Sequence, residues 1–345
     1  MKIRKLSVQH IRSHDSFSLS FNDHTTAITG KNGTGKTTLL EAIYIALQGT
    51  SFRDSDASIL RHGETWWRID VDDDSDSRRT ISFDSEKVAR KKQFKIFEGT
   101  SYRMKPKDKY PVVLFEPEDL RLLHGSPSRR RDFIDRFISQ LNPLYGESLR
   151  KYERALKQRN NLLKQSLVSK EELFAWNVSL SEYGAYVIEQ RVLFIERLQL
   201  KLPDLYNQIS DKHDDVSLHY SHTVIGNPKQ RLLHELEQST ERDNVLGYTS
   251  VGPHRHDIIF EFNGGPALTI ASRGEIRSIV LALKFLEVEI ITELTGSTPI
   301  VLLDDVFSEL DEDRQKRLMM MSSQVILTSV AVPDGVSVES VRQLS

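Results

Sequence analysis

The chain has 345 residues, 38% of them hydrophobic and 28% charged, with a net charge of −2 and no cysteine. This composition excludes a disordered or collagen-like chain, and the lack of cysteine excludes disulfides, thiolate metal sites and cysteine nucleophiles. The sequence contains neither a run of about 18 apolar residues nor the apolar core of a signal peptide, so we expect a cytoplasmic protein with one large domain or two ordinary ones.

The N-terminal part of the chain predicts strands with one helix between them. Alternating apolar residues, short β-prone runs and an acidic turn between two apolar segments are typical of strands and a hairpin. Strands are expected at 2–10, 17–21, 25–29, 67–71, 79–83 and 112–115, and a helix at 37–48.

The pattern changes after residue 125. Pro127 after Ser126 is typical of a helix start, and apolar spacings of three, four and seven residues continue to about 210. Strands at 257–262, 300–303 and 325–327 and an apolar helix at 276–293 follow. We therefore expect an α/β head in two halves, 1–125 and 246–345, split by a mainly helical arm, 126–245.

A phosphate-binding loop is the strongest motif. Residues 30–37, GKNGTGKT, fit G-x-x-x-x-G-K-[ST] between a β run and a helix. The glycines let backbone N–H groups face phosphate oxygens, and the helix adds the positive end of its dipole. Lys36 is expected to reach the β- and γ-phosphates and Thr37 to hold Mg²⁺. The nucleotide-binding candidates here are Gly30, Lys31, Asn32, Gly33, Thr34, Gly35, Lys36, Thr37 and Thr38.

A phosphate loop needs a further metal-side carboxylate at the tip of a neighbouring strand. The apolar run 300–303 ends in Asp304 and Asp305, where buried acids without a role would be costly. We expect Asp304 to order Mg²⁺ and its water, and Asp305 to polarise the attacking water as the catalytic residue. The alternative is an ordinary strand that runs out into an acidic loop. Taken alone, the sequence of residues 308–311 predicts the acidic N-terminus of a helix that is capped by Ser308.

The long apolar helix opens with ASRGEIR, residues 271–277. Ser272 and Glu275 fit the S-x-x-E capping box. Ser272 and Gly274 at a helix N-terminus also make a good anion site. The sequence does not choose between these two interpretations, and both can hold.

These motifs in this order resemble the ABC-type ATPase heads of SMC and Rad50 proteins, and the finer resemblance is to the RecF family. The short helical arm agrees with that family, because SMC and Rad50 proteins have long coiled coils there. The blocks that resemble RecF cover essentially the whole chain: LQGTSFR (47–53), VLFEPEDLRLLHGSPSRRRDFID (113–135), QRN (158–160), GPHR (252–255), LALK (281–284) and LLDDVFSELD (302–311).

The resemblance implies an ATP-dependent homodimer, with ATP and Mg²⁺ held head to tail between two protomers. Ser272 and Gly274 would touch the γ-phosphate bound by Lys36 of the other copy, and 308–311 would face the dimer. Arg12 matches an N-terminal arginine that contacts nucleotide; a surface charge is the alternative. Glu116 and Asp119 lie where such heads have the loop that senses the nucleotide.

The resemblance also implies a role at DNA. The dimer would clamp duplex DNA near single-strand gaps or junctions and help RecO and RecR load RecA, in the cytoplasm at the nucleoid and away from membranes. Weak hydrolysis would reset this switch. The basic run 87–109 interleaves with aromatic residues, which suits phosphates and unpaired bases; an ordinary solvated hairpin is the alternative. The DNA-binding candidates are Lys91, Lys92, Lys95, Arg129 and Arg130.

The chain departs from the family pattern near the signature. It has Ser272-Arg273-Gly274-Glu275 where the family usually has S-Q-G-Q, and Glu275 would be repelled by a triphosphate unless Arg273 or Arg277 offsets it. His256 stands in the place of the usual acid after GPHR, and Thr328 in that of the switch histidine of transporters. We expect these differences to affect the rate of ATP hydrolysis more than the binding of ATP.

Two other classes of protein compete with this interpretation. A nuclease-coupled ATPase would need a metal-binding carboxylate cluster outside the nucleotide pocket, and the sequence shows none that is convincing. A transporter nucleotide-binding subunit is disfavoured, because its two motifs lie much closer together than Lys36 and Asp304.

Overall fold

A computed structural model describes residues 1–165, 169–222, 226–307, 310–319, 323–332, 336 and 341–344. These form two compact units, one made of Met1–Asp119 with Val288–Ser345 and the other of Leu120–Glu287. The first unit therefore combines both ends of the chain. The three-segment division expected above stays a prediction about domains.

The first unit contains two sheets. A six-stranded antiparallel sheet has the order β2-β1-β4-β5-β6-β7, and a five-stranded parallel sheet has the order β14-β3-β13-β12-β8. The antiparallel strands are β1 (Ile3–Ile11), β2 (His14–Ser20), β4 (Trp66–Asp73), β5 (Arg78–Asp84), β6 (Lys92–Ile96) and β7 (Gly99–Ser101). The parallel strands are β3 (Thr25–Thr29), β8 (Val112–Phe115), β12 (Ile300–Leu303), β13 (Val325–Ser329) and β14 (Val341–Gln343).

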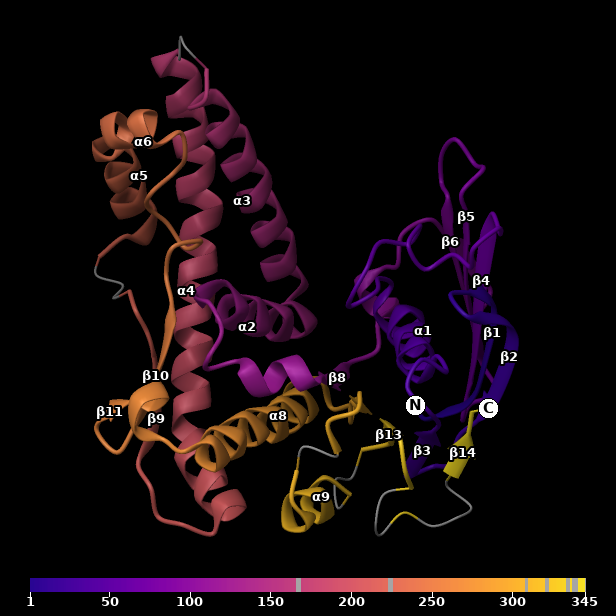
Figure 1. The fold of residues 1–345 in the computed structure, drawn as a ribbon. Coiled ribbons are helices and arrows are strands. Elements are labelled where there is room, and N and C mark those ends of the chain that lie inside the picture. Colours follow the sequence, from indigo (N-terminus) through magenta and orange to yellow (C-terminus); the bar gives the residue numbers. More distant parts are fainter. Residues whose placement is uncertain are drawn as a thin grey trace. The chain divides into compact units, whose positions relative to one another are not determined.

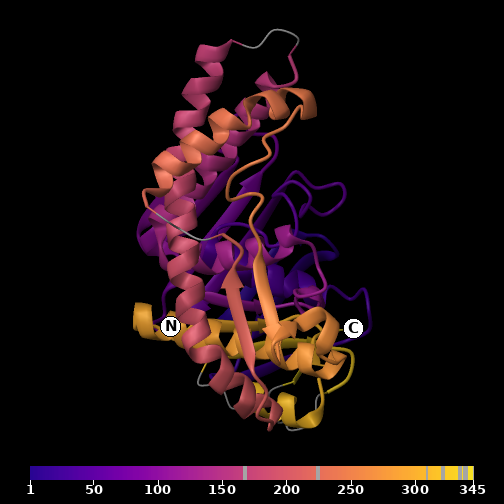
Figure 2. The same ribbon diagram turned by 90° about the vertical axis from the view of Figure 1, so that its left-hand side faces the viewer.

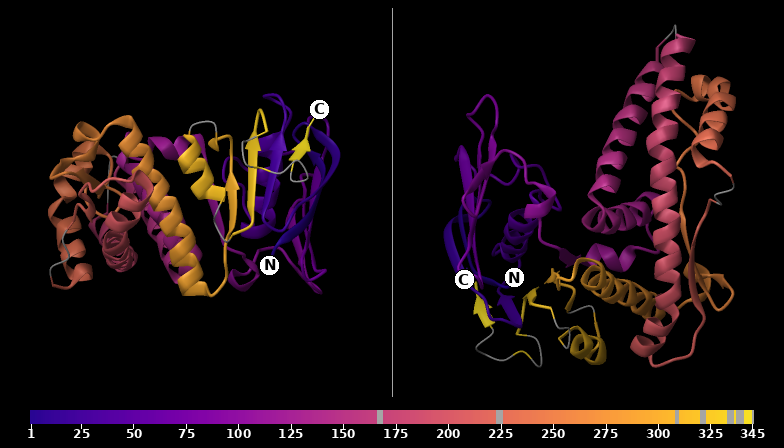
Figure 3. Two further views of the ribbon diagram at one scale, coloured as in Figure 1. Left: turned by 90° about the horizontal axis from the view of Figure 1, so that it is seen from below. Right: turned by 180° about the vertical axis from the view of Figure 1, so that it is seen from behind.

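Helix α1 (Lys36–Gln48) packs within this unit. One hydrophobic core joins its apolar side chains to both sheets, for example Leu40 to Ile69 and Leu302. Figure 1 shows α1 against one face of the six-stranded sheet, and Figure 3 shows the same arrangement from behind. The unit also contains α9 (Glu312–Met319). The tight packing explains why nearly every residue of α1 is buried.

The second unit is mainly helical. Its longest helix, α4, packs against α3, α5 and β9, and Figure 2 shows β9 and β10 side by side along it. Its elements are α2 (Pro127–Leu141), α3 (Pro143–Leu162), α4 (Lys170–Ser210), β9 (Val216–Tyr220), α5 (Pro228–Gln238), α6 (Thr240–Leu246), β10 (Ile258–Phe262), β11 (Gly265–Pro266) and α7 (Ala267–Ile270). The boundary between the units falls inside α8 (Arg273–Thr295).

The expected strands at 25–29, 112–115 and 300–303 are confirmed at those bounds, and the others shift by a few residues. The basic run contains the hairpin of β6 with β7, which the sequence analysis gave as the alternative for this segment. Strand β9 was also missed. The helical prediction for 126–210 is confirmed, and Pro203 lies inside α4.

Candidate nucleotide-binding site

The phosphate loop and the acidic pair meet at one edge of the parallel sheet. Strands β3, β13, β12 and β8 run in the same direction, so their carboxyl ends lie at the same edge. The loop after β3, Asp304 after β12 and Glu116 after β8 are therefore neighbours. The Asp304 N–H donates to the carbonyl oxygen of Phe115, 2.9 Å away, and the Glu116 N–H donates to Asp119 Oδ2 at 3.0 Å.

The loop itself has the backbone that its glycines predict. Gly33 and Gly35 have φ of 86° and 89°, the left-handed region that favours glycine. A Cβ on Gly35 would lie only 2.3 Å from His14 Nε2, so that position also needs glycine for space. Lys31, Asn32 and Gly33 are exposed, whereas Lys36 and Thr38 are buried.

The Lys36 ammonium is turned back onto its own loop. Its Nζ donates to the carbonyl oxygens of Gly30, at 2.9 Å, and Lys31, at 3.2 Å. Thr34 Oγ1 donates to the same Lys31 carbonyl at 2.9 Å. The loop is thus closed around a buried cation, which is the charge that phosphate oxygens require.

Thr37 and Asp304 are in direct contact although far apart in the sequence. Thr37 Oγ1 donates to Asp304 Oδ1 at 2.8 Å, and Thr328 Oγ1 donates to the same oxygen at 2.9 Å. Burial raises the pKa of Asp304 above its ordinary value, and the two hydroxyl hydrogen bonds act against that shift. Three oxygens are thereby gathered beside the phosphate loop, and oxygens are the ligands that Mg²⁺ prefers.

Asp305 occupies an unusual backbone position. Its φ is 49°, which is uncommon for a residue other than glycine. Its N–H donates to Thr328 Oγ1 at 2.9 Å, so Thr328 links both acids. Backbone strain of this kind gathers at functional sites, and here the chain bends directly after Asp304.

Arg12 lies within an ion-pair cluster. Its Nε donates to Glu41 at 2.9 Å and its Nη2 to Asp54 at 2.7 Å, and the Glu41 bond is the main cause that raises the pKa of Arg12. Glu41 is buried in α1 and we missed it. The sequence did indicate Glu41, because it is an acid in the middle of the apolar run of α1 and a buried carboxylate needs a charged or hydrogen-bonding partner.

The signature residues belong to the second unit. The Ser272 N–H donates to Glu275 Oε2 at 2.8 Å and the Glu275 N–H to Ser272 Oγ at 3.3 Å, which confirms the capping box. Lys212 donates to Glu275 at 2.8 Å and, with the Ser272 bonds, lowers the pKa of Glu275 to about 2. Lys212 is thus a cation that pairs with Glu275, and an offset of the Glu275 charge by Arg273 or Arg277 stays a prediction.

The described residues give no steric or conformational reason for a glycine at position 274. Its backbone is not among the positive-φ glycines, and a Cβ there would meet no atom nearer than Ser272 Oγ at 4.0 Å. Of the expected dimer-facing segment, Ser308 and Glu309 lie outside the described residues. Asp311 caps α9, since the Arg314 N–H donates to its Oδ1 at 3.0 Å.

The DNA-binding candidates in the basic run have different surroundings. Lys91 and Lys95 are exposed. Lys92 pairs with Asp56 and lies over the rings of Trp67 and Phe94, and burial lowers its pKa. Lys92 is thus part of the packing of the six-stranded sheet.

The two arginine candidates on α2 also differ. Arg130 makes a bidentate pair with Asp257, 2.8 Å for each bond, and its Nη1 donates to the carbonyls of Leu123 and Gly125. Arg129 is half-buried beside Gly125. Arg130 therefore has a structural role, and a DNA contact by either arginine stays a prediction.

Comparisons with known proteins show which family the chain resembles. A family model described as "AAA domain" matches residues 5–244. The chain is 36% identical over 332 residues to the DNA replication and repair protein RecF of Streptococcus pyogenes serotype M49, and equally to that of serotype M5, covering 92% of this chain and 88% of each relative.

Solved structures show the same similarity. A structure of the recombination mediator protein RecF with ATP, in the RecFOR pathway, has a TM-score of 0.85 at 28% identity and covers 97% of this chain and 93% of that one. An Smc head bound to the C-winged helix domain of ScpA has a TM-score of 0.50 at 16% identity, over 96% of this chain and 90% of that chain, and shares the fold. Among the described residues, no helix is long and apolar enough to cross a membrane.

The chain has the fold of an ABC-type ATPase head, which it shares with the Smc head, and a helical segment divides it in sequence. Within that class the sequence similarity is specific. The chain belongs to the RecF family of DNA replication and repair proteins.

Proposed function

We propose that this chain is an ATP-dependent DNA-binding switch, in which ATP and Mg²⁺ bind at the edge of the parallel sheet and join two copies. The observation that carries the proposal is the 2.8 Å hydrogen bond between Thr37 and Asp304. This bond brings the last residue of the phosphate-loop motif into contact with the acid that follows β12, which is far away in the sequence. The solved RecF structures with ATP and with an ATP analogue support the choice of nucleotide.

The residues present fit a nucleotide triphosphate with a hard cation. Lys36 Nζ has carbonyl partners within its loop. Lys36 is also the first residue of α1, where free N–H groups and the helix dipole favour an anion. Position 33 is open, because a Cβ there would meet nothing within 4 Å. Thr37 and Asp304 would hold Mg²⁺, which supplies polarisation of phosphoryl oxygens when bound.

Hydrolysis would depend on Asp305. Its carboxylate follows Asp304 at a strained turn, and Thr328 fixes its backbone. Asp305 would orient and activate the attacking water, while Asp304 stays with the metal. We expect slow turnover, so that ATP acts as a switch and hydrolysis resets it.

The second copy would complete the site through its signature. Ser272 and Gly274 stand at the N-terminus of α8, where N–H groups and the helix dipole favour an anion. Open space around Gly274 leaves room for the close approach of another molecule. Arg12 is proposed as a nucleotide contact that would exchange Glu41 and Asp54 for phosphate.

The proposed substrate of the switch is duplex DNA near single-strand gaps or junctions. Lys91 and Lys95 are the exposed cations of the basic hairpin that support it. The solved RecF structures are described as part of the RecFOR pathway. We propose that this chain likewise works with RecR and RecO to load RecA, at the nucleoid.

The test compares Asp305→Asn with the parent by sedimentation in ATP-Mg²⁺. The variant should bind ATP, hydrolyse it at least about tenfold more slowly, and remain dimeric for longer. Adding Ser272→Arg should abolish the dimer and leave nucleotide binding intact, because Ser272 acts on the other copy. Asp313→Asn, an exposed acid on α9, is the matched control. A monomeric Asp305→Asn, or a dimeric double variant, would contradict the proposal.

A further inference from the structure

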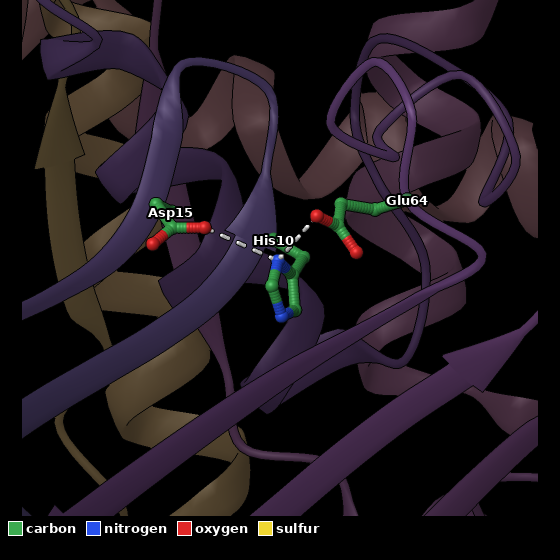
Figure 4. A group of neighbouring side chains, drawn as sticks. All are labelled: His10, Asp15 and Glu64. Carbon is green, nitrogen blue, oxygen red and sulfur yellow. Dashed lines mark ion pairs between the residues drawn. The ribbon is translucent and has the colours of Figure 1, made fainter.

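Folding brings an imidazole and two carboxylates together at a place the nucleotide site does not use. His10 stands near the end of β1, Asp15 in β2 and Glu64 in the turn before β4. Their ligand atoms all lie within 4.8 Å of one another, and Figure 4 shows both carboxylates directed at the His10 ring. No sequence motif indicates this cluster, because Glu64 is distant along the chain from His10 and Asp15.

The backbone holds these three residues in place. The Arg61 N–H donates to the His10 carbonyl oxygen at 3.0 Å, and the Glu64 N–H to the Arg61 carbonyl at 3.1 Å. The hairpin pairing of Ile11 with His14 places Asp15 alongside His10. Trp66 contacts the His10 ring edge to face, with centroids 4.4 Å apart, so the imidazole plane is also fixed.

The spacing of the ligand atoms is wrong for hydrogen bonds. His10 Nδ1 lies 3.4 Å from Asp15 Oδ1 and 3.5 Å from Glu64 Oε1. Hydrogen bonds between such groups are about 2.7–3.0 Å long. Among the described residues, this buried nitrogen has no hydrogen-bond partner.

The same spacing suits a metal ion. Zinc bonds to nitrogen and oxygen are about 2.0–2.1 Å, and two ligands at a tetrahedral angle are then about 3.4 Å apart. One imidazole and two carboxylates are ligands for Zn²⁺ and neighbouring transition metals, whereas Mg²⁺ prefers oxygen alone. Asp15 is 67% exposed, which leaves the remaining position open to water.

We propose that His10, Asp15 and Glu64 form a binding site for a divalent transition metal, with Zn²⁺ as its best-fitting ion. The metal would tie β1, β2 and the turn before β4 to one another. The turn between β1 and β2 carries Arg12 and packs through His14 against Gly35 of the phosphate loop. The site would thus brace the segment that supports that loop. Arg61 Nε, 3.9 Å from Asp15, is the competing cation.

The test is a calorimetric titration of the full chain with Zn²⁺, in buffer that contains excess Mg²⁺ to occupy the nucleotide site. We expect one equivalent of Zn²⁺ to bind, and Glu64→Gln and Asp15→Asn each to weaken it about tenfold or more. His62→Gln, an exposed histidine two residues from Glu64, is the matched control and should bind as the parent does. The lack of cysteine removes thiolate sites that would obscure the result.

Thermal unfolding gives a second measurement. Zn²⁺ should raise the midpoint of the parent and of His62→Gln, and should raise that of Glu64→Gln clearly less. Circular dichroism and ATP binding show whether each variant is folded. If Glu64→Gln is not folded, Asp15→Asn takes its place in the comparison. Absence of stoichiometric binding by the parent would overturn the site. Binding that both carboxylate variants retain unchanged would overturn it as well.

Discussion

Gly274→Asp should distinguish the effect of this position on the stability of the single chain from its effect on the proposed dimer. Ser272 caps α8, so position 274 lies in the first turn of that helix, and a Cβ has free space there. Glycine costs about 1 kcal/mol against alanine inside a helix, and an acid in the first turn gains about 0.3–1 kcal/mol from the dipole. The variant should therefore be as stable as the parent or about 0.5–1 kcal/mol more stable. Its thermal midpoint should rise by about 1–4 °C.

The effect on association should have the opposite sign. In the proposed dimer this position approaches the γ-phosphate of the other copy. Two like charges about 4 Å apart cost about 4 kcal/mol at an effective dielectric constant of 20. That is about a thousandfold weaker ATP-dependent association, since the substitution adds a negative charge and no cation to offset it.

Sedimentation velocity with ATP-Mg²⁺ and thermal unfolding by circular dichroism measure the two effects. Gly274→Ala is the control, because it removes glycine without adding charge. It should dimerise better than Gly274→Asp and be as stable. A Gly274→Asp variant that dimerises like the parent would refute the contact between signature and phosphate. A clearly lowered midpoint would refute the statement that the chain itself does not need this glycine.

Three further predictions follow from the site and its surroundings. Lys36→Ala should weaken ATP-Mg²⁺ binding about 10–100-fold by calorimetry with unchanged circular dichroism, since it removes a charged donor; unchanged affinity would exclude the phosphate loop. Lys91→Glu with Lys95→Glu should lower the salt slope of DNA binding by about 0.9 for each phosphate that the variant no longer neutralises. Lys92 is left intact because it is packed, and an unchanged slope would mean a merely solvated hairpin. The pKa of Glu275 is about 2 in the folded protein against an ordinary 4.5, so its stabilising effect is present above pH 4.5 and lost as the pH falls toward 2. Thermal midpoints should fall less steeply in Glu275→Gln over that range, and equal slopes would contradict the Lys212 pairing.

The contact between the phosphate loop and Asp304 was largely predictable because its information is local. The phosphate loop is a contiguous motif between a strand and a helix, and the buried strand before Asp304 is a short apolar run. Parallel strands then bring their carboxyl ends together without further sequence information. What could not be predicted is the pairing of Lys212 with Glu275, because the two lie far apart in the chain and no periodic pattern links them.

Charge alone does not separate the packed from the exposed lysines among the DNA-binding candidates, whereas strand alternation does. In β6, Lys92, Phe94 and Ile96 share one face and are directed toward the core, whereas Lys95 faces outward. A lysine in register with two buried hydrophobic residues must find a carboxylate inside, and Asp56 supplies it. If the basic run is treated as a strand whose side chains alternate between two faces, Lys92 faces the core and Lys95 stays the better candidate for a DNA contact. Arg130 offered no such pattern, since only folding brings Asp257 to it.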